Sequence, residues 1–203
     1  MPWQVSYFPP CRHHAFLSHS REDHDDLVRP VYNALVGQRV ASWIDRHHYP
    51  SGVDSRTALK TSLLESRHVV FFVTEAMIAS GRGWCVLELA YSELLQQNLT
   101  TAIGPLANLL LPLYFVPQGH ASLPRTVWQV ARDRGAFHDP RGGLDRVSWA
   151  VAEIRAFLSR EARSAKQNAT RARKDATFRE SLETPEGLRR RVTRFDPQAI
   201  PEE

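Results

Sequence analysis

The chain has 203 residues, of which 42% are hydrophobic and 24% are charged, with a formal net charge of +4. This composition is typical of a globular protein with room for one domain and an extension, and two cysteines are too few for a disulfide scaffold. No apolar run is long enough to span a bilayer and no secretory signal opens the chain, so we expect a cytoplasmic protein without membrane contact. The mild positive charge permits contact with nucleic acid but does not require it.

Strands and helices alternate along the chain, after an irregular, proline-containing lead-in at residues 1–12. We predict strands at 13–20, 39–45, 68–74, 110–116 and 135–139. We predict helices at 21–38, 57–66, 81–95, 123–134 and 144–160. Pro30 fits its helix only in the first turn or at a kink, and Gly37 supplies a stop. Five such alternations predict an α/β fold of flavodoxin-like type, a five-stranded parallel sheet with helices on both faces.

A charged C-terminal extension follows at residues 161–203, with few large apolar residues and charges of both signs. Residues 161–183 could form a solvated helix, and residues 189–191 are a cluster of three arginines. Such a segment cannot build a core of its own. It is either a surface or disordered tail, which we favour, or an arm for a partner, a nucleic acid or another copy of the chain.

Ligands of such folds bind at the carboxyl ends of the strands, where the direction of chain winding reverses. The segments expected at that edge are 18–23, 45–55 and 74–84. Trp84 and Glu88 lie one helical turn apart at the start of the helix that leaves this edge. An indole beside a carboxylate suits an aromatic, cationic or polyhydroxylated ligand, although packing and a favourable helix dipole could also explain the pair.

Familiar nucleotide and nucleophile motifs are absent. There is no phosphate-binding GxxxxGK[ST] loop, and Val86 stands where the third glycine of a dinucleotide-binding fingerprint would be. The consecutive residues Ser18, His19 and Ser20 alternate faces while they remain extended, so they cannot form a nucleophile–base pair among themselves.

Metal and paired-carboxylate sites are not indicated either. The histidine pairs at 13–14 and 47–48 lack the usual Cys/His ligand spacing, so we expect surface histidines and no metal. Glu93 lies five residues after Glu88 and points elsewhere on the helix.

A single carboxylate can still hydrogen-bond ribose hydroxyls and stabilise the positive charge that develops when a sugar C–N bond breaks. The nicotinamide of NAD is already a cationic leaving group and needs little acid assistance.

The order of motifs resembles that of a Toll/interleukin-1 receptor (TIR) domain over residues 13–160. AFLSHSRED resembles the first box of the family, and SWIDRHHYPSG resembles its second strand with the BB loop. TALKTSLLESRHVVFFVT is similar to the helix that enters the third strand, together with that strand. GWCVLELAYSELL is similar to the WCxxEL segment, and LLPLYF resembles the fourth strand. The chain resembles a stand-alone bacterial TIR protein of the kind used in anti-phage defence.

The resemblance implies cleavage of NAD at its nicotinamide–ribose bond, without a further cofactor and with Glu88 as the catalytic carboxylate. The residues that it implies at the substrate are Trp84, Phe16, Ser18, His19, Ser20 and Arg21. His19 and Ser20 stand where many relatives have an aromatic residue followed by arginine.

The resemblance also implies self-association through TIR–TIR contacts at the BB loop, with an effector that reads the product. The loop residues concerned are Asp45, Arg46, His47, His48, Tyr49, Pro50 and Gly52. Two other functions stay open, a TIR adaptor that assembles without chemistry and, less favoured, a nucleic-acid-dependent activity of the basic extension.

Overall fold

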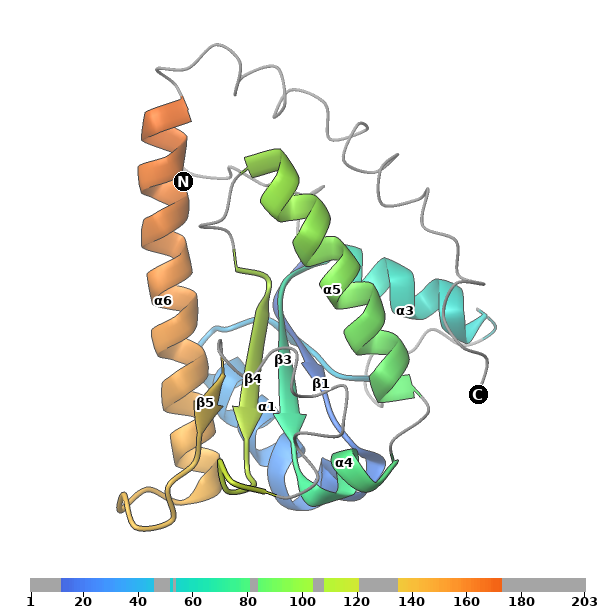
Figure 1. Ribbon diagram of the computed structural model, residues 1–203, viewed down its shortest axis with the longest axis vertical. Helices are drawn as coiled ribbons and strands as arrows, with labels where there is room; N and C mark the ends of the chain where they lie inside the picture. The colour runs from blue at the N-terminus through green and yellow to red at the C-terminus, as the bar shows by residue number, and fades with distance from the viewer. Residues whose placement is uncertain are drawn as a thin grey trace.

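The computed structural model describes residues 12–45, 52, 54–80, 84–103, 108–120 and 135–172. These residues include a five-stranded, all-parallel sheet with the order β2-β1-β3-β4-β5 (Figure 1). Its strands are β1 (His13–Ser18), β2 (Ser42–Trp43), β3 (Ser66–Val73), β4 (Leu110–Tyr114) and β5 (Ala136–Phe137). The predicted α/β class and flavodoxin-like sheet are therefore confirmed.

Helices cover both faces of the sheet (Figure 1). They are η1 (Arg21–Asp23), η2 (His24–Val28), α1 (Arg29–Gly37), α3 (Ser55–Leu64), α4 (Glu75–Ser80), α5 (Trp84–Ile103) and α6 (Arg146–Ala172). Val69 and Phe71 of β3 pack with α3, α4 and α5, whereas Val70 and Phe72 pack with η2, α1 and α6. Successive strand residues point to opposite faces, so an unbroken apolar strand serves both layers.

The second strand is shorter than the predicted 39–45 because the turn after α1 uses part of that segment. Arg39 adopts a left-handed backbone with φ of 62°, and the Val40 N–H donates to the Leu35 carbonyl at 2.9 Å. Gly37, which was expected to stop the helix, is the last residue of α1, and the left-handed backbone conformation occurs two residues later. Only Ser42 and Trp43 remain to pair with β1.

Pro30 occupies the first turn of α1, as one of the two sequence alternatives required. The preceding η2 is a π-helical turn, in which the Arg29 N–H donates to the His24 carbonyl five residues earlier. In a regular helix interior the proline ring would clash with the carbonyl four residues earlier, and one backbone hydrogen bond would be lost. A wider turn immediately before the proline reduces this clash.

Helices α4, α5 and α6 differ from the predicted helices in presence or length, and two predicted features lie outside the described residues. The six residues of α4 were expected to be loop, and they are too few to give a helical period. Helix α5 continues to Ile103, beyond the predicted end at 95. Helix α6 continues past 160 to Ala172, so the helix considered possible for residues 161–183 is present as far as residue 172. The glycines before α5 and the predicted helix 123–134 lie outside the described residues. None of the helices searched among the described residues has the length and hydropathy to cross a membrane.

Candidate active site

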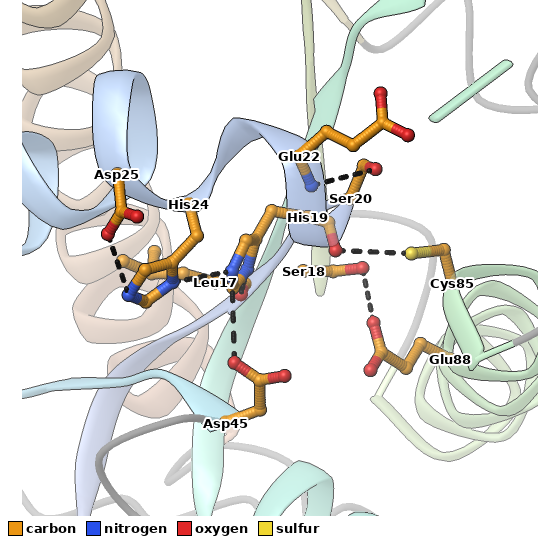
Figure 2. Close-up of polar contacts among 10 residues, drawn as sticks. All are labelled: Leu17, Ser18, His19, Ser20, Glu22, His24, Asp25, Asp45, Cys85 and Glu88. Atoms are coloured by element: carbon orange, nitrogen blue, oxygen red, sulfur yellow. Dashed lines mark hydrogen bonds and ion pairs between the residues drawn. The ribbon is translucent and has the colours of Figure 1, made fainter. Parts of the chain in front are cut away.

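The candidate site lies where β1 ends, at the point where the chain reverses its winding between β1 and β3. Ser18 is the last residue of β1 and is 1% exposed. Its hydroxyl donates to Oε2 of Glu88 on α5 at 2.5 Å, across 70 residues of sequence (Figure 2). The two residues that the sequence places at this edge of the sheet are therefore in direct contact.

Glu88 has an unusual electrostatic environment. Burial, followed by repulsion from the Asp45 carboxylate, raises the pKa of Glu88 from 4.5 to about 8, and the hydrogen bond from Ser18 opposes this shift. At neutral pH the carboxyl group is thus mostly protonated, and a cation nearby would favour its ionised form. Carboxyl groups with such raised pKa values occur often at functional sites.

Cys85 holds α5 against the loop that follows β1. Its thiol donates to the carbonyl of His19 at 3.2 Å (Figure 2). Burial is the main cause that raises the pKa of this thiol, and the Glu88 carboxylate raises it further. A thiol with a raised pKa is a poor nucleophile, so Cys85 positions the loop and does not attack a substrate.

A second contact secures the same loop to the end of β3. The Thr74 hydroxyl donates to the Asp23 carboxylate at 2.6 Å, and it accepts from the Met77 N–H at 3.1 Å. Thr74 therefore caps α4 while it fixes the loop. Burial raises the pKa of Asp23, and the hydrogen bond from Thr74 opposes that change.

His19 points away from Ser18 and toward a separate polar group (Figure 2). Its Nδ1 donates to the Leu17 carbonyl at 3.0 Å, and its Nε2 lies 3.1 Å from Nδ1 of His24. The same Nε2 lies 3.7 Å from Oδ1 of Asp45. The alternation predicted for residues 18–20 is thus seen directly, because Ser18 and His19 serve opposite sides of the strand end.

The remaining residues predicted at the substrate lie in different environments. Trp84 is 43% exposed at the first position of α5, one turn before Glu88. Phe16 is buried and stacked on Trp43, with ring centroids 4.4 Å apart, so it supports the site from the core. Ser20 is buried and caps η1 by accepting from the Glu22 N–H at 3.4 Å. Arg21 is exposed.

Only two of the predicted BB-loop residues belong to the described part of the chain. Asp45 joins the polar group around His19, and Gly52 has a left-handed φ of 79°. The other loop residues in the prediction lie outside the described residues: Arg46, His47, His48, Tyr49 and Pro50.

Sequence reasoning did not single out four residues that the structure places here. His24, Asp23, Thr74 and Cys85 each contact the loop after β1. Asp23 and Thr74 belong to the segments 18–23 and 74–84 that were expected at this edge, but no individual role was predicted for them. His24 follows His19 by five residues, a spacing that no standard ligand motif contains.

Comparison with known proteins agrees with this architecture. The TIR domain family matches residues 15–128, a span that includes most of β1, Glu88 and β4. No curated protein matches the chain. The match covers more than half of the 203 residues. The chain therefore belongs to the TIR domain family.

Proposed function

We propose that the protein cleaves the nicotinamide–ribose bond of NAD, with Glu88 as the catalytic carboxylate. The observation that carries the proposal is the contact of Ser18 with a carboxyl group whose pKa lies near 8, at the sheet edge where such folds bind ligands. TIR domains include both NAD-cleaving enzymes and adaptors, so the residues of this site have to decide between the two.

The reaction needs a group that stabilises positive charge on the ribose. When the C1′–N bond breaks, its electron pair leaves with neutral nicotinamide and C1′ becomes cationic. Ionised Glu88 would hold the ribose hydroxyls and this charge, and binding of cationic NAD would favour the ionised form. Water then adds to C1′ and loses a proton, which gives ADP-ribose; attack by a ring nitrogen of the adenine would give a cyclic product instead.

Trp84 and the loop after β1 would contribute binding more than chemistry. An exposed indole one turn from the carboxylate can pack on a planar ring of the substrate. Ser18 would keep Glu88 oriented, while Phe16 and Ser20 support the strand end from within. Arg21 is an exposed cation on the same loop that could meet the diphosphate.

Self-association through the BB loop is part of the proposal, together with a role in bacterial defence inside the cytoplasm. In this scheme assembly completes the site, and the released ADP-ribose product is read by a downstream effector.

The test is incubation of purified protein with NAD at high concentration, followed by chromatography with mass detection. Glu88→Gln is the matched control, because it keeps the shape of the side chain and removes the charge. We expect nicotinamide release by the wild type and loss of at least a hundredfold in the variant, with an unchanged circular dichroism spectrum. Equal turnover by both proteins would refute the role of Glu88. No turnover even when the chain is fused to a forced oligomer would favour the adaptor.

A further inference from the structure

His19, His24 and Asp45 present three ligand atoms to one point beside the candidate active site. One ligand atom from each of these three residues lies within 4.8 Å of the other two. Both histidine side chains are only 4% exposed, whereas the Asp45 side chain is 45% exposed. The group is therefore anchored from within and open to solvent on one side.

The two separations measured from His19 Nε2 are compatible with a shared metal ion. Ligand atoms bound to tetrahedral Zn²⁺ at about 2.0–2.1 Å are separated from one another by about 3.3–3.4 Å. The separations from His19 Nε2 are 3.1 Å to His24 Nδ1 and 3.7 Å to Asp45 Oδ1, which bracket this value. Two imidazoles and one carboxylate suit a divalent transition metal, whereas Mg²⁺ and Ca²⁺ prefer oxygen ligands.

The outer nitrogens of both rings are oriented as metal-bound histidines require. Nδ1 of His19 faces the Leu17 carbonyl, which can only accept, so this nitrogen carries a proton and leaves Nε2 free to bind a metal. Nε2 of His24 faces the Asp25 carboxylate at 4.0 Å, which favours a proton there and an unprotonated Nδ1. Each ring thus presents a lone pair to the same point.

A metal ion also accounts for the two nitrogens that face each other. At 3.1 Å, Nε2 of His19 and Nδ1 of His24 cannot both carry a proton. Without a metal one ring must donate to the other. With a metal both nitrogens are ligands, and the protons remain on the outer nitrogens that face oxygen atoms.

We propose that His19, His24 and Asp45 form a binding site for a divalent transition-metal ion such as Zn²⁺, with a fourth position open to solvent. The ion would join the loop after β1 to Asp45, which lies two residues after β2, and β2 itself pairs with β1 through only two residues. This inference does not depend on NAD cleavage, because metal binding is measured directly and Glu88 is not a ligand.

The experiment uses the full chain without an affinity tag, after treatment with a chelator and dialysis. Zn²⁺ is titrated in competition with a chromophoric chelator, and Co²⁺ is added separately to record its visible absorption. We expect one ion per chain, a strong Co²⁺ spectrum of the four-coordinate type and no competition from millimolar Mg²⁺. Zn²⁺ at about 100 times its Kd should raise Tm by about 5–10 °C.

Matched variants separate this site from other histidines of the chain. Asp45→Asn keeps the shape of the side chain and replaces a partly exposed residue, so it should leave the fold intact while it weakens Zn²⁺ binding at least tenfold. His24→Gln should abolish Zn²⁺ binding. His120→Gln, at a loop histidine 3.8 Å from Glu75, and Glu88→Gln should bind as the wild type does. The proposal is overturned if wild-type protein binds no Zn²⁺, or if folded Asp45→Asn binds it as tightly as the wild type.

Discussion

Replacing Glu88 by glutamine should change how protein stability depends on pH. The folded protein retains the Glu88 proton up to a pH of about 8, whereas the unfolded chain loses it near 4.5. Between these values the folded state binds more protons, so the wild type loses stability as pH rises. Glutamine carries no proton to lose, and it can still accept from the Ser18 hydroxyl.

The magnitude follows from the two pKa values. At about 1.36 kcal/mol for each pH unit, the interval from 4.5 to 8 corresponds to about 4.8 kcal/mol. Glu88 is partly exposed as a residue, and nearby solvent reduces this figure, so we expect Glu88→Gln to gain about 3–4 kcal/mol in free energy of unfolding over the wild type by pH 8.5. Below pH 4.5 the two proteins should be nearly equal in stability.

Urea unfolding followed by circular dichroism at half-unit steps from pH 4 to 8.5 measures this difference. Glu75→Gln is the control, because the Glu75 side chain is 80% exposed and its replacement should change stability little at any pH. A difference between wild type and Glu88→Gln that stays constant with pH would refute the burial of an ionisable group at this position. A variant that loses stability relative to the wild type as pH rises would refute the sign.

Three further predictions concern activity, acid stability and packing. If ionised Glu88 is the catalytic form, kcat/KM for NAD should rise with pH up to about 8, and Ser18→Ala should move this rise to higher pH in a steady-state profile; a flat profile would contradict the assignment. Burial lowers the pKa of His68 to about 3, so its contribution to stability is complete above pH 6.5 and is lost as pH falls toward 3. As pH falls from 6.5 to 4.5, the free energy of unfolding measured in urea should therefore decrease by about 2–3 kcal/mol less for His68→Leu than for the wild type, and an equal decrease in both proteins would contradict this. A methyl group at Gly135 would overlap the Tyr114 ring, so Gly135→Ala should cost about 1–3 kcal/mol in the same assay, and unchanged stability would show that the ring can move aside.

The sheet could be predicted from the sequence because its central strands are continuous apolar runs between helices of regular period. The run from Val69 to Val73 could only be buried on both faces, and this fixed β3 at the centre. The position of Ser18 and Glu88 at one edge of the sheet also followed from the rule for parallel sheets, whereas their hydrogen bond is known only from the structure.

Other features depended on contacts that no local pattern contains. The left-handed backbone at Arg39 shortened β2, although arginine gives no signal for that conformation. The group of His19, His24 and Asp45 joins two segments from different strand ends, so ligand spacing along the chain could not reveal it. The only clustered histidines in the sequence are the adjacent pairs, for which we expected no metal, and His13 and His14 are not members of this group.

Both outer strands of the sheet are only two residues long, β2 with Ser42–Trp43 and β5 with Ala136–Phe137. An outer strand has unpaired backbone N–H and C=O groups that can pair with a strand of another molecule. The longer the unpaired strand, the greater the tendency for such pairing. Edges this short provide little backbone for such pairing. If molecules of this protein associate, the two outer strands as the structure describes them would contribute little backbone pairing, and the contact would depend on side chains of helices and loops.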